Sequence, residues 1–432
     1  MKNAKIFIIS VASILSLCAC GKAEAPDKIK FNEIGSTCMV PAKVKEYIDA
    51  MKEQEKRLEH PYRISSLFGP EDFGWQETDI DDGVEAKVGG GVDVCDYINR
   101  TDFKNKLNPV NIEISWDKGE VEYDEATLYF STNKDMSDAR EVAITGGATT
   151  ASLENLYRAT KYYYQLDTGS YKSHVYSFDT DDYPRLIFCD KINNVRDLGG
   201  YDTAYGVKTN QGLVYRGMEI NSKSFNHSGN HDANVTDKLL EVQNEILQIG
   251  KEIDLRADNA TDGTNECHLV GNPGDQEARD AYERLTVIAY DDFVNNSSST
   301  AKYARIFEIL ANADQEHVYF HCWGGADRTG MVAFFLNAIL GVSYTDLVID
   351  FELTSATNNR RCHMHNSNNA HFPKFLHAFT TYANYDANKT LNENCERFLL
   401  DKGVTKENIE KIRTNFLPGY KASTTYPEPA IA

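Results

Sequence analysis

Positive charge is scarce in this sequence. Lysine and arginine together number 45 against 65 aspartate and glutamate residues, so the formal net charge of the 432-residue chain is -20. Such a chain would repel broad polyanions, which argues against duplex nucleic acid or an anionic membrane surface as a partner. A site for a phosphorylated ligand therefore has to be local and pre-organised. The length is sufficient for two or three domains with separate cores.

The N-terminus lacks an apolar run long enough to span a bilayer. Lys2 and Lys5 precede an apolar stretch over residues 6–17, which is shorter than the roughly 20 residues of a spanning helix and predicts a secretion signal. The Leu-Cys-Ala-Cys segment that ends at Cys20 resembles a bacterial lipobox, in which cleavage before the second cysteine leaves it to be acylated. The resemblance implies a lipoprotein signal peptide and lipobox at 1–20 and an extracytoplasmic protein, lipid-anchored to a bacterial membrane on its periplasmic or surface face. An ordinary secretory peptide would also export the chain.

Cysteine pairs with zinc-site spacing are missing as well. Nine cysteines are present, and none forms the Cys-x2-Cys pair typical of zinc sites. No metal and no other cofactor is expected. An exported protein can oxidise its thiols, but the available cysteines allow many pairings and none is assigned. The cysteines left after the signal, the anchor and Cys322 are set aside are Cys38, Cys95, Cys189, Cys267, Cys362 and Cys395.

Residues 21–104 are interpreted as a tether followed by a poorly defined N-terminal region. The polar stretch 21–30 is the tether. Apolar residues then recur at helical spacing among charged ones between 41 and 60, which predicts an amphipathic helix. These residues are Val44, Tyr47, Ile48, Met51 and Leu58.

Residues 105–180 contain short alternating runs separated by turn residues, a pattern typical of a small β-sandwich. Strands are predicted at 110–116, 126–131, 141–144, 161–167 and 173–178. The segment resembles a fibronectin type III module, because Trp116 matches the core tryptophan of an early strand and Leu156 with Tyr162 matches the tyrosine corner. The resemblance implies an all-β domain that acts as a spacer or docking unit.

Residues 184–422 alternate predicted strands with helices, which indicates an α/β domain with a central sheet flanked by helices. A buried strand at 317–320 leads into the loop 321–330, and a helix follows over 329–340. Ligand sites of α/β domains lie at the carboxyl ends of the strands, so this loop is the candidate site.

The loop reads His-Cys-Trp-Gly-Gly-Ala-Asp-Arg-Thr-Gly. Two glycines let successive amides turn inward, and the helix dipole adds positive potential, so the loop can cradle a phosphate. The same amides and Arg328 would stabilise a thiolate on Cys322 and make it a nucleophile near neutral pH. The predicted phosphate-binding residues are Trp323, Gly324, Gly325, Ala326, Asp327 and Arg328.

Other residues of the loop have supporting roles. The planar guanidinium of Arg328 can hold two phosphoryl oxygens. Thr329 supplies a hydroxyl that could stabilise the sulfur as it leaves, and His321 is expected to fix the loop through hydrogen bonds. A P-loop NTPase is excluded because no Lys-Ser/Thr pair follows the glycines.

The loop carries a Cys-x5-Arg signature and resembles the protein tyrosine phosphatase superfamily. Further segments are similar to the atypical bacterial tyrosine phosphatases related to the secreted mycobacterial enzyme, over about residues 192–417; they are Asn-Val-Arg-Asp-Leu-Gly-Gly at 194–200, Val-Tyr-Arg-Gly at 214–217, Asp-Leu-Arg at 254–256 and Gly-Val-Thr at 403–405. The resemblance implies a cysteine-dependent phosphomonoesterase, a protein tyrosine or dual-specificity phosphatase that works through a phosphocysteine intermediate without a metal. Segment 194–200 is interpreted as scaffold.

The leaving oxygen needs a proton, and two aspartates compete for the role of general acid. Asp254 occupies the position to which the family resemblance assigns this role, and it is ranked first. Asp327 lies inside the loop and also matches a family position of suspected catalytic importance, so it stays an alternative. Arg256 is interpreted as an ion-pair partner.

The substrate is left open. Related enzymes often carry a lysine, associated with phosphoinositides, where this chain has Ala326, which weakens a lipid-phosphatase interpretation. The alternative is a cysteine phytase-like or small-molecule phosphatase for inositol phosphates or phosphoinositides, and a third hypothesis is an idle binding module. The expected partners are a phosphorylated protein or small phosphomonoester and the membrane, but no nucleic acid. The oligomeric state is not predicted.

Overall fold

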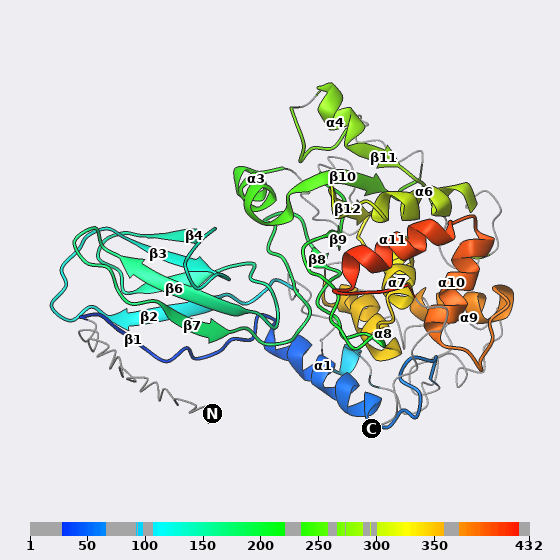
Figure 1. The fold of residues 1–432 in the computed structure, drawn as a ribbon, viewed down its shortest axis with the longest axis horizontal. Helices are drawn as coiled ribbons and strands as arrows, with labels where there is room; N and C mark the ends of the chain where they lie inside the picture. Colours follow the sequence, from blue (N-terminus) through cyan, green and yellow to red (C-terminus); the bar gives the residue numbers. More distant parts are fainter. Residues whose placement is uncertain are drawn as a thin grey trace, which may run out of the picture.

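A computed structural model of the chain shows two domains side by side (Figure 1). It describes residues 28–65, 92, 94–97, 107–220, 235–257, 266–272, 274–287, 294, 300–357 and 371–422. The predicted signal peptide and Cys20 lie outside these ranges. No helix within them has the length and apolar character needed to cross a membrane.

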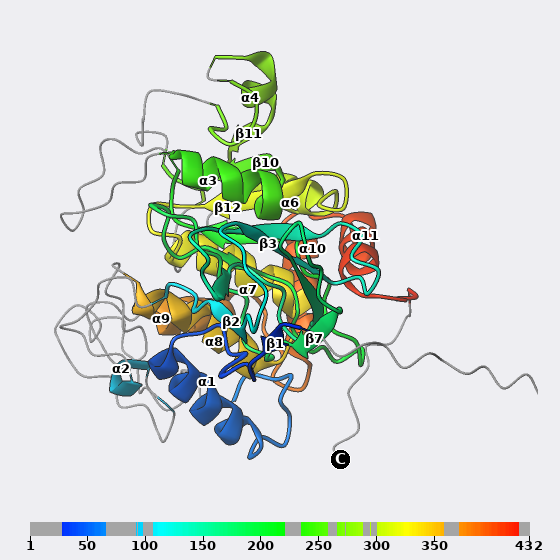
Figure 2. The same ribbon diagram turned by 90° about the vertical axis from the view of Figure 1, so that its left-hand side faces the viewer.

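The first domain consists of two antiparallel sheets around one core (Figure 2). Alternating side chains of the strands point into this core, as in β6, where every second residue is buried. One sheet has the order β1-β2-β5, formed by Lys30–Phe31, Ile112–Asp117 and Thr150–Leu153. The other has the order β4-β3-β6-β7, formed by Arg140–Ile144, Ala126–Ser131, Lys161–Asp167 and Tyr176–Asp179.

The residues that suggested this domain occupy its core. Trp116 in β2 is buried and donates its indole N–H to the hydroxyl of Tyr123 at 2.8 Å. The hydroxyl of buried Tyr162 accepts a hydrogen bond from the backbone N–H of Tyr157 at 2.9 Å, which is the contact that a tyrosine corner makes. The sequence did not predict β1, which pairs with β2 and follows the fully buried Ile29. The end of the predicted tether is therefore part of the sheet.

The second domain is built on a five-stranded sheet with the order β11-β10-β12-β9-β8. Strands β11 to β9 are parallel, and β8 is an antiparallel edge strand. Val318 and Phe320 of β12 face one apolar core, whereas Tyr319 between them faces a second core on the other side of the sheet. The strands span Tyr282–Arg284, Ile249–Asp254, His317–His321, Val214–Gly217 and Arg196–Asp197.

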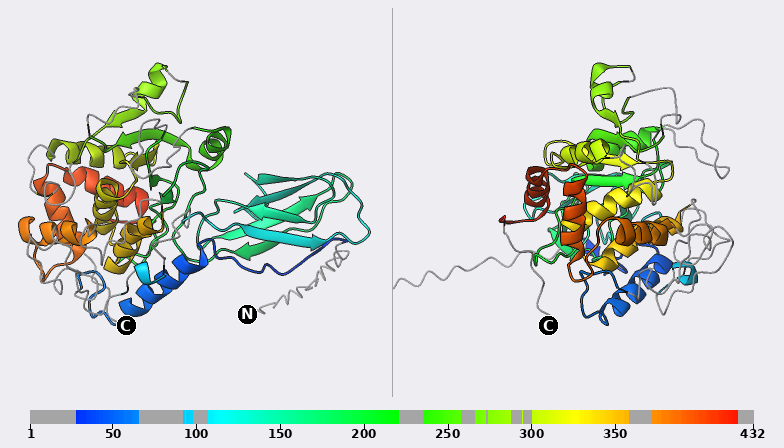
Figure 3. Two further views of the ribbon diagram at one scale, coloured as in Figure 1. Left: turned by 180° about the vertical axis from the view of Figure 1, so that it is seen from behind. Right: turned by 90° about the vertical axis from the view of Figure 1, so that its right-hand side faces the viewer.

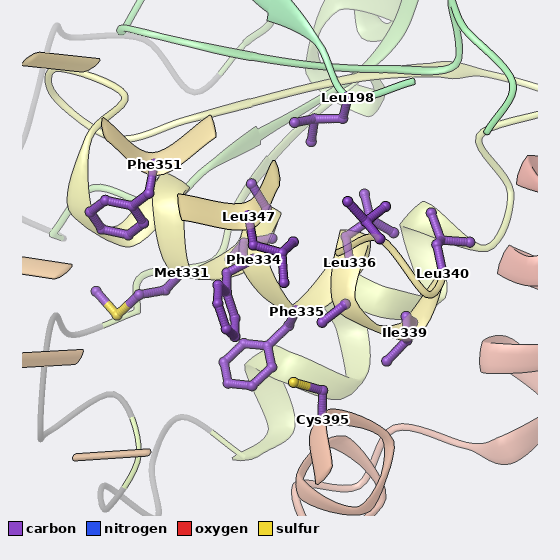
Figure 4. Close-up of a cluster of buried hydrophobic side chains, with 14 of the residues drawn as sticks. Leu198, Met331, Phe334, Phe335, Leu336, Ile339, Leu340, Leu347, Phe351 and Cys395 are labelled. Atoms are coloured by element: carbon purple, nitrogen blue, oxygen red, sulfur yellow. The ribbon is translucent and has the colours of Figure 1, made fainter. Parts of the chain in front are cut away.

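Helices cover both faces of this sheet (Figure 3). The larger core surrounds α7, in which every residue from Thr329 to Ile339 is buried. Figure 4 shows side chains of α7 gathered with Leu347 of α8 and Cys395 of α10. The helices are α3 (Asp237–Val242), π-helix η2 (Gln243–Leu247), α4 (Gln276–Asp280), α6 (Thr300–Leu310), α7 (Asp327–Ile339), α8 (Tyr344–Leu353), 3-10 helix η4 (Thr354–Ala356), α9 (His371–Tyr382), α10 (Leu391–Asp401) and α11 (Lys406–Phe416).

The predicted amphipathic helix is present as α1, Ala42–Glu55, and its apolar stripe is buried. Val44, Tyr47, Ile48 and Met51 belong to the same core as α7, and α1 contacts α8. A short helix, α2 (Val94–Tyr97), contacts α1. Residues well before 184 therefore complete the α/β core, which the sequence pattern alone did not reveal.

Candidate active site

The candidate loop lies where prediction placed it, between the carboxyl end of β12 and the amino end of α7. In the parallel register His321 lies opposite Asp254 of β10 and Gly217 of β9, so the ends of three strands meet at this loop. Cys322 is buried, with 2% of its surface exposed, and Arg328 is half-buried.

The backbone carbonyls of residues 322–326 all accept hydrogen bonds from side chains or from a backbone amide. The Asn194 side chain donates to the carbonyls of Gly324 and Gly325 at 2.9 and 3.1 Å. The guanidinium of Arg216 donates to the carbonyls of Gly325 and Ala326. The remaining two carbonyls, of Trp323 and Cys322, accept from the Glu219 N–H and from the His321 ring.

This carbonyl pattern fixes the direction of the loop amides. In a trans peptide the N–H points away from the C=O of the same plane. Because the carbonyls of residues 322–326 are bonded to the surrounding protein, the amides of residues 323–327 point the other way, toward the interior of the loop. A ring of inward-facing N–H groups is an anion-binding site.

Gly325 is required by the packing of this loop. Its φ is +65°, in the left-handed region that favours glycine. A Cβ atom placed on it would lie 2.1 Å from the carbonyl oxygen of Gly217 in β9. A side chain at this position would therefore push the loop off the strand beside it.

A buried ion cluster supports the loop from below. Asp350 of α8 accepts from Arg196 of β8 at 2.7 Å and from Arg216 of β9 at 2.5 Å. Burial and the neighbouring Arg196 lower the pKa of Arg216 to about 10. Removing one member of such a cluster leaves an uncompensated buried charge, which typically costs about 3–5 kcal/mol. The cluster therefore fixes both arginines in position.

The thiol of Cys322 is shifted toward its ionised form. Burial alone would raise its pKa, and the Asp327 carboxylate acts in the same direction. The positive charge of Arg328 and the neighbouring polar groups of Thr329 outweigh both, so the pKa of Cys322 lies below its ordinary value. Arg328 is itself anchored, since it donates to the carbonyl of Leu255 at 3.1 Å.

His321 is fully buried and has acceptors on both sides. Its Nδ1 lies 2.9 Å from the Cys322 carbonyl, which can only accept, so Nδ1 carries a proton. Its Nε2 lies 2.8 Å from the carboxylate of Glu252 in β10. Burial opposes the charged ring, but hydrogen bonding to Glu252 and the nearby Asp254 carboxylate raise the pKa of His321. His321 thus joins the loop to β10 through its two ring nitrogens.

The two candidate acids have different surroundings. Asp254 is fully buried and accepts from Arg256, from the Tyr282 hydroxyl at 2.6 Å and from Arg284. Although burial alone would raise it, His321 and these donors hold the pKa of Asp254 well below its usual range. Asp327 is the first residue of α7 and acts electrostatically on the sulfur of Cys322.

Arg256 is an ion-pair partner, as the sequence suggested. Its guanidinium binds Asp254 and donates to Glu219 at 3.0 Å. It also lies 5.3 Å from the centre of the ring of Trp323, a residue of the loop. Tyr282 and Arg284 of β11 complete this network, and they follow an insertion that gave no sequence signal of a role.

Sequence reasoning missed the polar residues that hold the loop. Asn194 and Arg216 were within recognised motifs, but their hydrogen bonds to carbonyls more than 100 residues away could not be read from spacing. Glu219, Glu252 and Asp350 carried no motif. The sequence does show that each is a charged residue within or beside an otherwise buried element, and a buried charge requires a partner.

The described cysteine side chains carry free thiols, on Cys38, Cys189, Cys267, Cys322 and Cys395. In the described ranges no group of His, Cys, Asp and Glu side chains is arranged to hold a metal ion.

Comparison with known proteins identifies the second domain. A search of curated proteins returned no match. The sequence matches the family described as the tyrosine phosphatase family over residues 187–418, more than half of the chain. This match agrees with the resemblance seen in the loop and supports a phosphatase, a hydrolase, on an α/β fold. The chain belongs to the tyrosine phosphatase family.

Proposed function

We propose that this protein is a cysteine-dependent protein tyrosine or dual-specificity phosphatase that acts through a phosphocysteine intermediate. The observation that carries the proposal is the outward anchoring of the five carbonyls of residues 322–326, because it turns their paired amides toward the centre of the loop. Cys322 begins this loop and Arg328 lowers the pKa of its thiol. Preorganised amides of this kind stabilise the charge of a transferring phosphoryl group.

The reaction has two steps. The Cys322 thiolate attacks phosphorus in line with the leaving oxygen, so an S–P bond forms while the P–O bond breaks. A carboxylic acid donates its proton to the leaving oxygen. Water then attacks phosphorus of the phosphocysteine and gives a proton to the same carboxylate. The S–P bond breaks, which restores the Cys322 thiolate beside the Thr329 hydroxyl and releases inorganic phosphate.

The acid in this scheme is Asp327 rather than Asp254. A general acid has to be protonated at the start of the reaction, whereas Asp254 is held as an anion by Arg256, Tyr282 and Arg284. Asp327 lies beside the nucleophile, where its carboxylate acts on the sulfur. This assignment reverses the ranking that motif position suggested, because motif position carries no information on ion pairing.

The phosphoprotein substrate is favoured over a polyanion. An inositol phosphate would need free basic side chains around the loop, but Arg256 and Arg284 are both paired with Asp254. Position 326 is alanine rather than the lysine associated with phosphoinositides. Phosphotyrosine and phosphoserine peptides, phosphoinositides and inositol hexakisphosphate should be compared as substrates, and fastest turnover of the last would reject this choice.

We further propose that the chain is exported and anchored through Cys20, on the basis of its apolar N-terminal run and lipobox-like segment. We also propose that the phosphatase domain is related to the secreted mycobacterial enzyme and that the all-β domain is a fibronectin type III module, because the sequence resembles both. Wild-type protein should incorporate labelled palmitate and Cys20→Ala should not; a wild type that takes up no label would contradict the anchor.

The enzymatic proposal is tested at the nucleophile. Wild-type protein should release p-nitrophenol from p-nitrophenyl phosphate and show phosphate bound to Cys322 after rapid denaturation at neutral to alkaline pH. Cys322→Ser should abolish both. The buried Cys395→Ser, in α10, is the control and should retain turnover. Activity that survives Cys322→Ser would rule out the mechanism.

A further inference from the structure

The edge strand β8 connects the two domains because its two residues have partners on different sides. Neighbouring side chains of a strand point to opposite faces. Arg196 points toward the loop support, where it binds Asp350 and the Asn194 side chain. Asp197 points the other way and forms a buried ion pair with Arg185 at 2.8 Å.

Apart from its ion pair with Asp197, the Arg185 side chain is held by the all-β domain. Its Nε donates to the carbonyl of Leu156 and one terminal nitrogen donates to the carbonyl of Asn155, both at 3.1 Å. Its guanidinium also lies 3.9 Å from the centre of the Tyr157 ring. These three residues form the turn between β5 and β6. Arg185 is 2% exposed, so the whole arrangement is shielded from water.

The backbone of the segment around Arg185 also pairs with the backbone of β8 and the residue before it. The Asp197 N–H donates to the Arg185 carbonyl, and the Ile187 N–H donates to the Val195 carbonyl. The side chain of Asn155 binds the next residue, Phe188, through both its oxygen and its nitrogen. Segment 185–188 is therefore fixed between the β5–β6 turn on one side and β8 on the other.

The contacts from the β5–β6 turn through segment 185–188 and β8 extend to the phosphate-binding loop, residues 321–330. Asp197 also accepts the backbone N–H groups of Gly199 and Gly212, which fixes the turn after β8. On the other side of the strand Asn194, held by Arg196, donates to the loop carbonyls of Gly324 and Gly325. A displacement of β8 would thus move the donor that orients the loop amides.

We propose that Arg185 is a positioning residue for phosphoryl transfer: it ties the β5–β6 turn of the all-β domain to β8 and thereby holds Asn194 against the phosphate-binding loop. The all-β domain is then part of the catalytic machinery rather than a spacer. The proposal rests on the proposed phosphatase function. Because the loop must hold its oxyanion to within a fraction of an ångström, small shifts of Asn194 are sufficient to slow the reaction.

The test compares two buried arginines at the same domain junction. Arg158 also lies in the β5–β6 turn, but its side chain binds Asp182 and contacts Tyr201 instead of β8. We expect Arg185→Met in the full chain to lower kcat for p-nitrophenyl phosphate roughly 10- to 100-fold and to weaken orthovanadate binding by a similar factor. Arg158→Met should keep both values within about twofold of wild type.

A second variant covers the possibility that Arg185→Met does not fold. Asn155 has a φ of 56°, so Asn155→Gly removes both bonds to Phe188 without backbone strain. It should shift vanadate affinity and kcat in the same direction as Arg185→Met. Folded variants at Arg185 or Asn155 with wild-type vanadate affinity, or equal losses in Arg158→Met, would overturn the positioning role. A wild type without Cys322-dependent turnover would refute the phosphatase proposal instead, and vanadate titration would still test the positioning.

Discussion

At the scale of single residues, the ionisation of the Cys322 thiol depends on the positive charge of Arg328. Burial disfavours its anion, and Arg328 is the largest influence in the opposite direction. Replacing Arg328 by Met should therefore raise the pKa of Cys322 toward or above the ordinary thiol value of about 8.5. The rate of alkylation by iodoacetamide, measured against pH, reports this ionisation. An unchanged midpoint in Arg328→Met would show that the amides alone hold the thiolate.

The general acid gives a second prediction at this scale. Asp327→Asn should lower kcat by about 100- to 10,000-fold for substrates with poor leaving groups. It should also remove the fall in kcat at alkaline pH, because that fall reflects loss of the acid's proton. Asp254→Asn should keep the alkaline fall. The opposite pattern in the two pH profiles would return the acid role to Asp254.

Asp254 has a different expected signature, in stability. Its pKa is lowered in the folded protein, so its ion pairs stabilise the fold above about pH 4 and lose this effect as the pH falls further. Asp254→Asn leaves Arg256 and Arg284 without their shared anion. The variant should lose about 3–5 kcal/mol of unfolding free energy at pH 7, and less in acid. Urea unfolding at both pH values separates this effect from catalysis.

At the scale of elements, the loop between β12 and α7 depends on close approach to β9. Gly325→Ala would bring Cβ to 2.1 Å from the Gly217 carbonyl at a positive φ. The loop should open, with a loss of phosphate and vanadate affinity of at least about tenfold. Gly206→Ala is the control for backbone strain, because Gly206 also has a positive φ but has no atom within 4 Å of its Cβ position. Equal loss of vanadate affinity in both variants would contradict the steric argument.

The sequence predicted elements whose signal is local. The β12 strand, the loop and α7 follow one another in the chain, and the stripe of α1 repeats at helical spacing, so both were predictable. The two-residue strands β1 and β8 were not, because each exists only through pairing with a distant partner. The role of Asp350 likewise could not be predicted, because its ion-pair partners are arginines more than 130 residues away in sequence.

The site was predicted with the same limits. The position of Cys322 and Arg328 in one loop between β12 and α7 could be predicted because these segments follow one another in the chain, and their roles stay predictions. The hydrogen bonds of Asp254 could not be predicted, because Tyr282 and Arg284 of β11 reach it only in the folded sheet. The pKa of a carboxyl group depends on its neighbours, and the neighbours of Asp254 come from segments that are distant in sequence.

At the scale of the whole molecule, the phosphatase core is completed by a helix that precedes the all-β domain in sequence. Figure 1 shows α1 leading from that domain along the underside of the α/β domain, and its stripe lies in the core around α7. The family match begins only at residue 187. The part of the chain that folds as the phosphatase is thus larger than the part that sequence comparison recognises.

This wider core predicts that a substitution far from the matched region weakens the phosphatase. Met51 of α1 is fully buried, so Met51→Ala should lower the unfolding free energy by about 2–5 kcal/mol through lost burial and the cavity it leaves. Exposed Glu53→Ala on the same helix should stay within about 0.5 kcal/mol of wild type. The measurement is thermal or urea unfolding followed through loss of p-nitrophenyl phosphate turnover, which reports the α/β domain. If Met51→Ala lost turnover at the same unfolding midpoint as wild type while α1 unfolded separately, α1 would not be part of the phosphatase core. The folded phosphatase domain would then coincide with the residues of the family match.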